Sequence, residues 1–224
     1  MTPPARRARH LTLPLLVTLL CAVVAACGGD PVVMQGSADN SGGVMSSGGD
    51  PRFNGAEPAT PYRMPDITLT ATNGQPFNLI TDTAYPVTLV FFGYTHCPDV
   101  CPLVMSDVAQ TMLQLPGDVA HRTQFVFITT DPARDTPGVL REYLDHYNPD
   151  FVGLTGGLGD IVKAADAMGV AIEGRQQLPG GGYDVGHGAQ VVGFRGNEAP
   201  VVWTDGTPIS DMVSDIDTLA ESAR

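Results

Sequence analysis

The feature that most constrains the fold is an apolar stretch that ends next to two cysteines. Residues 87–92 (Val-Thr-Leu-Val-Phe-Phe) are nearly all β-branched, aliphatic or aromatic, which is typical of a central strand covered on both faces. Gly93 ends this run, and Cys97 and Cys101 follow. Apolar side chains then recur every three or four residues through 99–115, which predicts an amphipathic helix. The cysteines are therefore expected where a buried strand leads into a helix.

That position has chemical consequences for the two thiols. Residues four apart in a helix lie on the same side of one turn, so the sulfurs of Cys97 and Cys101 are near enough to bridge or to bind one ion. Unpaired N–H groups and the positive end of the helix dipole favour a thiolate at a helix N-terminus and lower its pKa.

The rest of the globular region predicts a mixed α/β fold. Turn signals and alternating patterns indicate an N-terminal hairpin, a second buried strand, three further helices and a late hairpin. The expected segments are strands 66–70 and 75–79, strand 124–130, a helix opening at 136–137, helix 160–168, a short strand 170–173, a Gly-rich loop 174–188, strands 189–195 and 200–204, and helix 208–220. This order favours a mixed sheet with helices on both faces.

The N-terminal region predicts an export signal followed by a tether. Basic residues precede the apolar run 11–26, which is shorter than the roughly 20 residues of a membrane-spanning helix. Residues 24–27 (Val-Ala-Ala-Cys) resemble a bacterial lipobox, which makes 1–26 a lipoprotein signal and Cys27 a lipidated residue; an ordinary signal peptide is the alternative. Residues 27–60 are rich in Gly, Ser and Pro and predict a flexible tether, which leaves 61–224 as the folded domain.

Charge excludes one class of partner. The formal net charge is −12, and an acidic surface of this kind repels nucleic-acid phosphates and keeps a protein soluble. Nucleic-acid binding is therefore not expected.

Cysteine usage isolates one pair. The chain has four cysteines; Cys21 would leave with the signal and Cys27 would carry lipid. In an oxidising compartment Cys97 and Cys101 would form a disulfide, a redox couple or a metal site. A disulfide that closes so short a loop stabilises a fold little, so a redox or metal-binding role is favoured over a structural disulfide.

Three motifs carry a family resemblance. Residues 93–102 (Gly-Tyr-Thr-His-Cys-Pro-Asp-Val-Cys-Pro) resemble the signature of the Sco (SenC) family of thioredoxin-like copper proteins. Residues 130–137 and 151–156 resemble two further motifs of that family. The resemblance covers roughly 61–220 and implies a thioredoxin-like mixed sheet flanked by helices, with an N-terminal hairpin extension.

The resemblance also implies a metal site. Cys97 and Cys101 fall on the family's copper thiolates, and His187 falls on its third ligand. Family members usually carry Asp before that histidine and Ser or Thr after it, whereas this chain has Gly186 and Gly188. The departure predicts a looser loop that lacks a side-chain hydrogen bond to the imidazole.

The implied function is extracytoplasmic copper delivery. By resemblance the client is the dinuclear copper centre of cytochrome c oxidase, in its copper-bearing subunit, with a copper donor or thiol reductant as a further partner. The protein would lie on the cell membrane, anchored through Cys27 on the extracytoplasmic face. Copper, as Cu(I) or Cu(II), would be bound by Cys97, Cys101 and His187. The resemblance implies a metallochaperone rather than an enzyme, with thiol-disulfide oxidoreductase activity as the alternative.

The chemistry of these three ligands also favours copper, and it leaves other functions of the cysteine pair open. Two soft thiolates and an imidazole suit Cu(I) in an open three-ligand site, whereas structural zinc recruits a fourth ligand. The main alternative is a thiol-disulfide reductase that uses Cys97 and Cys101 as its redox pair without a stable metal. A local disulfide, a solvated His187 and a pure docking module are the remaining alternatives.

Other polar residues near the motifs have less specific interpretations. His96 points away from Cys97 in the expected turn and is a tuning or surface residue rather than a ligand. His121 and His146 are expected to be solvated. Asp131 follows a central strand at the edge where sites of open sheets gather, and either supports the site or belongs to an ordinary Asp-Pro turn.

Overall fold

The computed structural model describes residues 52–83 and 85–222. The expected signal sequence, Cys27 and most of the tether lie outside the described residues. Within the described part of the chain, no helix is both long and apolar enough to cross a membrane.

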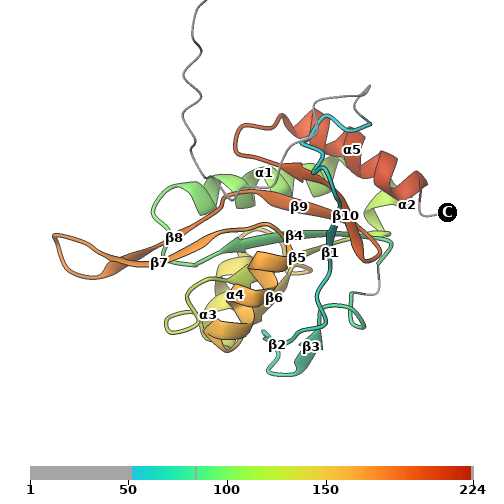
Figure 1. Cartoon of the computed structure of the whole chain (residues 1–224). Helices are drawn as coiled ribbons and strands as arrows, with labels where there is room; N and C mark the ends of the chain where they lie inside the picture. Colours follow the sequence, from blue (N-terminus) through green and yellow to red (C-terminus); the bar gives the residue numbers. More distant parts are fainter. Residues whose placement is uncertain (1–51, 84, 223–224) are drawn as a thin grey trace, which may run out of the picture. The chain divides into compact units, whose positions relative to one another are not determined.

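An eight-stranded mixed sheet forms the centre of the domain (Figure 1). In spatial order its strands are β1 (Tyr62–Arg63), β10 (Glu198–Trp203), β9 (Val191–Arg195), β4 (Val87–Gly93), β5 (Thr123–Thr129), β6 (Val152–Thr155), β2 (Thr68–Ala71) and β3 (Pro76–Asn78). β4, β5 and β6 run parallel, and every other neighbouring pair is antiparallel. The predicted mixed sheet and its N-terminal β2–β3 hairpin are confirmed.

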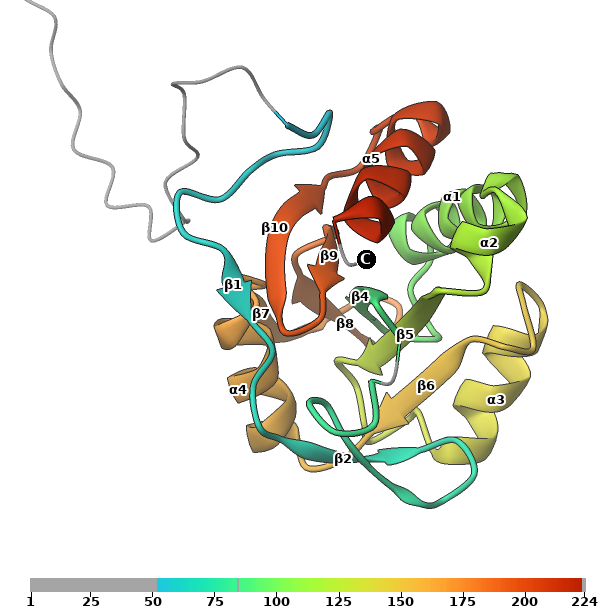
Figure 2. The same ribbon diagram turned by 90° about the vertical axis from the view of Figure 1, so that its right-hand side faces the viewer.

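Helices cover both faces of this sheet, as expected (Figure 2). They are α1 (Val100–Gln114), α2 (Gly117–Ala120), α3 (Pro137–Asp145), α4 (Leu158–Ala167) and α5 (Ile209–Glu221). Alternation along β4 explains the two layers, because Leu89 and Phe91 enter the core beneath α1, α3 and α5 while Val90 and Phe92 enter the core beneath α4. All seven residues of β4 are buried, which accounts for its continuous apolar sequence.

The segment expected to be a Gly-rich loop is a β-hairpin. β7 (Ile172–Gln177) pairs antiparallel with β8 (Tyr183–His187) in a separate two-stranded sheet that projects from the main one (Figure 1). Gly181 and Gly182 both have positive φ and form the reversal between the strands. The strand pattern is hidden in the sequence because most of β7 is exposed and carries polar residues. The interpretation of 174–188 as a loop was therefore wrong.

Three further elements were not expected from the sequence, and the first is the two-residue β1 at one edge of the sheet. β6 lies within the motif at 151–156, and its short apolar stretch is buried beside β5. The four-residue α2 begins at Gly117, directly after the end of the helix expected over 99–115.

The end of the expected tether packs against the domain. The Phe53 side chain is buried, and Ala56 forms a backbone bridge with Val202 of β10. The carboxylate of Asp215 on α5 accepts hydrogen bonds from the backbone N–H groups of Asn54 and Gly55, at 2.8 and 2.9 Å. The folded unit thus begins several residues before residue 61, because the buried Asp215 carboxylate needs hydrogen-bond donors and this segment supplies them.

Replacing Asp215 with Ala should lower the free energy of unfolding by about 2–4 kcal/mol. Besides the two backbone groups, the carboxylate accepts from the Asn54 amide at 2.9 Å and the Trp203 indole N–H at 2.8 Å. The substitution leaves these donors without a partner in a site where Trp203 is buried. Urea unfolding followed by tryptophan fluorescence measures the loss. Asp217→Ala on the same helix is the control, and an equal loss in both variants would contradict this role of Asp215.

Candidate metal centre

The cysteines lie where the sequence placed them, between β4 and α1. The Cys97 N–H donates to the Tyr94 carbonyl at 3.2 Å, which closes a turn after the strand. Asp99 caps α1, since its side chain accepts from the Val100 N–H at 2.7 Å. Cys101 lies in the first turn of α1, and its own N–H points to the Cys97 sulfur at 3.4 Å. Both cysteines are buried free thiols.

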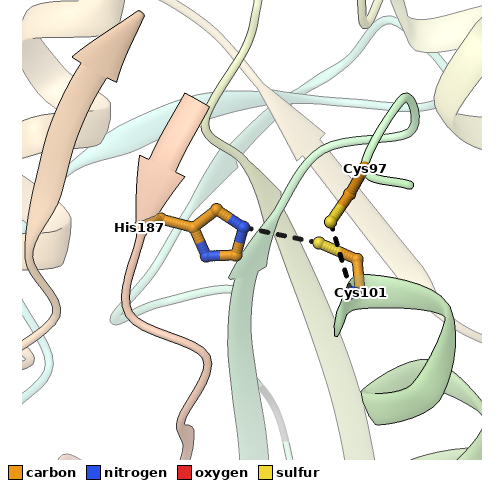
Figure 3. Close-up of side chains that lie close together, drawn as sticks. All are labelled: Cys97, Cys101 and His187. Atoms are coloured by element: carbon orange, nitrogen blue, oxygen red, sulfur yellow. Dashed lines mark hydrogen bonds between the residues drawn. The ribbon is translucent and has the colours of Figure 1, made fainter. Parts of the chain in front are cut away.

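His187 reaches this pair from the last position of β8, at the end of the β7–β8 hairpin opposite its turn (Figure 3). Its Nε2 lies 3.4 Å from the Cys101 sulfur. One ligand atom from each of Cys97, Cys101 and His187 lies within 4.8 Å of the others. Among the described residues, these three form the one group of histidine, cysteine or carboxylate side chains close enough to share a metal ion.

The imidazole is oriented by its surroundings. Its Nδ1 lies 2.9 Å from the Gly188 carbonyl oxygen. Because a carbonyl only accepts, Nδ1 carries the proton and the Nε2 lone pair faces the sulfurs. The rings of Phe91 and Tyr94 meet the imidazole edge to face, at centroid distances of 6.1 and 5.7 Å. The orienting hydrogen bond that the sequence predicted to be missing is thus supplied by the backbone.

The glycines that flank His187 fit their positions. A Cβ atom on Gly186 would lie 3.0 Å from Cβ of Glu173 on β7, and one on Gly188 would approach the Gln190 side chain at 2.3 Å. The Glu173 and Gln190 side chains thus fill the space that a side chain at Gly186 or Gly188 would occupy. The backbone at His187 belongs to a paired strand and not to a loose loop.

The two thiols are electrostatically unequal. The pKa of Cys97 is lowered, chiefly by a hydrogen bond from the Cys101 thiol and further by backbone N–H groups at the start of α1. The pKa of Cys101 is raised, because its proton is held in that hydrogen bond and because the side chain is buried. These opposite shifts favour a thiolate at Cys97 and a protonated thiol at Cys101.

Cys97 should be alkylated at least about tenfold faster than Cys101 at pH 7, because each unit by which a pKa is lowered raises the thiolate fraction about tenfold below the ordinary thiol pKa. Exposure acts in the same direction, since Cys97 is 8% exposed and Cys101 is 0% exposed. Iodoacetamide labelling between pH 5 and 9, resolved by peptide mass spectrometry, measures both rates. Cys97 should keep reacting below pH 7, whereas in unfolded protein both should follow ordinary thiol titration. Faster labelling of Cys101 in folded protein would contradict the assignment.

The other histidines stay outside the cluster. The His96 side chain is 53% exposed and its Nδ1 lies 2.9 Å from the Thr95 hydroxyl, as expected of a surface residue. His121 and His146 are exposed.

Two buried aspartates lie close to the site, and the sequence identified only one of them. Asp131 is paired with Arg134 and Arg175, so it is more than part of an Asp-Pro turn. Asp135 accepts hydrogen bonds from the Thr95 N–H and hydroxyl, beside the cysteine loop. The signal that could have found Asp135 is its place within the second motif, residues 130–137.

Comparison with known proteins identifies relatives over the folded domain. The family model described as SCO1/SenC matches residues 57–221. Protein SenC of Rhodobacter capsulatus is 43% identical over 103 residues, which are 42% of this chain and 46% of that protein. The chain spans about half the length of the curated relatives it matches.

Solved structures agree with this result. Apo Sco1 from Thermus thermophilus superposes with a TM-score of 0.67 at 29% identity, covering 77% of this chain and 99% of that one. Bradyrhizobium japonicum ScoI, solved with copper bound, gives a TM-score of 0.57 at 29% identity, covering 70% and 96%. The thioredoxin-like fold expected from the motifs is thereby confirmed. By its sequence motifs, its fold and the family match over most of its length, this chain belongs to the SCO1/SenC family.

Proposed function

We propose that this protein is a copper-binding metallochaperone whose ion is held by Cys97, Cys101 and His187. The observation that carries the proposal is the convergence of two sulfurs and one imidazole nitrogen within 4.8 Å. Soft thiolates select Cu(I) over harder ions, and imidazole also suits Cu(II). The copper-bound structure of Bradyrhizobium japonicum ScoI supports this choice of metal.

The surroundings fit an ion that is bound and then passed on. The lowered pKa of Cys97 favours the thiolate that binds copper, and Cys101 would give up its proton when copper binds. Phe91 and Tyr94 hold the imidazole without occupying its Nε2. Three protein ligands leave room for a ligand from the acceptor, which permits exchange between the two proteins.

The client that we infer is the dinuclear copper centre of cytochrome c oxidase, in the subunit exposed outside the cytoplasm. Support comes from the family to which the chain belongs and from its N-terminal sequence, in which a lipidated Cys27 would anchor the protein at the outer surface of the cell membrane. Fractionation of cells that make the wild type or Cys27→Ser tests the anchor: the wild type should sediment with membranes, and the variant should not. Copper transfer to the purified oxidase subunit tests the client.

A thiol-disulfide reductase is the second candidate, and the unequal thiols favour it. The Cys97 thiolate would attack a client disulfide, forming a mixed disulfide and releasing one client thiolate. Cys101 would lose its proton and attack the Cys97 sulfur, releasing the second client thiolate. The client gains two electrons and the protein is left with a Cys97–Cys101 disulfide, which an external dithiol must reduce.

Copper content separates the two functions. The reduced protein, purified without oxygen and incubated with excess Cu(I), should retain one ion per chain after gel filtration with a competing chelator. Retention of no copper, together with reduction of a disulfide substrate, would favour the reductase. Because the disulfide removes both thiolates, oxidised protein is the matched control and should bind no Cu(I).

A further inference from the structure

The two buried aspartates belong to one short turn after β5. The backbone N–H of Asp135 donates to the Asp131 carbonyl at 3.0 Å, and that of Arg134 donates to the same carbonyl at 3.1 Å. The turn is fastened to the site-bearing edge of the sheet, since the Thr130 N–H donates to the Gly93 carbonyl at 2.7 Å. The Asp135 carboxylate contacts the loop that carries the cysteines, and the Asp131 carboxylate contacts the hairpin that carries His187.

Asp135 holds the loop that carries the cysteines. One of its oxygens accepts from the Thr95 hydroxyl at 2.7 Å, and the other accepts from the Thr95 N–H at 3.1 Å and the Thr129 hydroxyl at 2.6 Å. Asp135 is completely buried. Thr95 lies two residues before Cys97, so these bonds fix the backbone from which the first thiolate projects.

Asp131 holds the hairpin that carries His187. The Tyr183 hydroxyl donates to its Oδ1 at 3.0 Å, and Arg175 donates to the same oxygen at 3.2 Å. Arg134 pairs with the other oxygen. The guanidinium carbons of Arg134 and Arg175 lie 3.9 and 4.4 Å from the Tyr183 ring centroid. Two cations and a hydroxyl therefore bind one buried carboxylate, and the Tyr183 ring packs against both guanidinium groups.

The contacts with Asp131 involve the same face of β8 that carries the His187 imidazole. Side chains alternate along a strand, so Tyr183, Val185 and His187 lie on the same face of β8. Val185 is buried, which shows that this face is turned towards the domain. Arg175 is the cross-strand partner of Val185. Fastening Tyr183 and Arg175 to Asp131 therefore sets the side on which His187 meets the sulfurs.

We propose that the turn 131–135 is a positioning element that aligns the two halves of the site, with Asp131 docking the His187 hairpin and Asp135 docking the cysteine loop. The role as an aligner of copper ligands rests on the proposed function. The docking itself is a property of the metal-free protein and is tested without copper.

Crossed variants of the full chain test the two halves separately. The double variant Arg175→Met/Tyr183→Phe removes both hydrogen bonds from the hairpin to Asp131 and keeps the aromatic ring. Amide hydrogen exchange of β8 should accelerate by about tenfold or more, because local opening then breaks fewer charge-assisted hydrogen bonds. NMR contacts of the His187 ring with Phe91 and Tyr94 should weaken. Exchange in the cysteine loop and in β9 should stay as in the wild type.

Thr95→Val gives the opposite pattern. Loss of the hydroxyl bond to Asp135 should accelerate exchange around Cys97 while β8 remains protected. Arg175→Lys keeps a cation beside Asp131 and should restore most of the protection in β8. Arg63→Met, which removes an exposed ion pair with Glu198 at 2.7 Å, is the control and should change neither region. Each single substitution, Arg175→Met and Tyr183→Phe, provides a milder test if the double variant unfolds.

Unchanged β8 protection and unchanged His187 ring contacts in the hairpin variants would overturn the proposal, as would equal loosening of both regions in either variant. Copper titration separates this failure from failure of the proposed function. If wild type binds one Cu(I), hairpin variants that lose protection should also show an altered Cu(II) spectrum. If wild type binds none, the exchange pattern still decides whether Asp131 and Asp135 dock the two segments.

Discussion

Replacing Cys101 with Ser is expected to nearly abolish Cu(I) binding. The hydroxyl is a hard, neutral ligand in place of a soft thiolate, and one thiolate with one imidazole cannot hold Cu(I) against competing thiols. Loss of a group that merely orients a ligand costs roughly 10–100-fold in affinity, so loss of a ligand itself should cost more. Competition titration with a Cu(I) chelator measures the change.

Two companion variants make this result specific. Cys97→Ser changes the other sulfur and should show the same loss. Ser106→Ala on the same helix removes a hydroxyl that donates to the Pro102 carbonyl at 2.8 Å and should bind copper like the wild type. If either Ser variant keeps wild-type affinity while remaining folded, the two sulfurs do not act as a pair.

Replacing His187 with Ala should weaken Cu(I) binding less and disturb the Cu(II) complex most. The two thiolates remain, and Cu(I) tolerates a sulfur-only site, so the loss of affinity should be smaller than in either cysteine variant. Cu(II) prefers nitrogen and oxygen ligands, so its complex should lose nitrogen hyperfine structure in electron paramagnetic resonance spectra. The pocket also loses edge contacts with Phe91 and Tyr94, which will loosen it further.

Matched histidine variants define the background for this experiment. His96→Ala changes the residue beside Cys97, and His146→Ala changes an exposed residue of α3's C-terminal cap. Both should retain the wild-type Cu(II) spectrum. If the Cu(II) spectrum of His187→Ala is identical to that of the wild type, the imidazole is not a copper ligand and only the chemistry of the two thiols remains.

Most of the fold could be predicted because its signals are local. The fully buried β4 is visible as an apolar run, and α1 is visible as apolar side chains that recur every three or four residues. The β7–β8 hairpin could not be predicted, because β7 is mostly exposed and polar and the hairpin is held partly by long-range hydrogen bonds to Asp131. The packing of Phe53 was hidden by the Gly-rich composition around it.

The sequence could predict some residues of the candidate site better than others. Cys97 and Cys101 stand four apart in one motif, so their proximity follows from helix geometry. His187 could be joined to them only by the family resemblance, because 86 positions separate it from Cys101. The role of Asp135 required coordinates, since its partner Thr95 is brought near by the pairing of β4 with β5.

X-ray absorption spectroscopy of the reduced protein loaded with one equivalent of Cu(I) tests the central claim most directly. With Cys97, Cys101 and His187 as ligands, the spectrum should require two sulfur atoms and one nitrogen atom around each ion, and the nitrogen should vanish in His187→Ala. A wild-type spectrum fitted by sulfur alone, or one unchanged by loss of His187, would contradict the account.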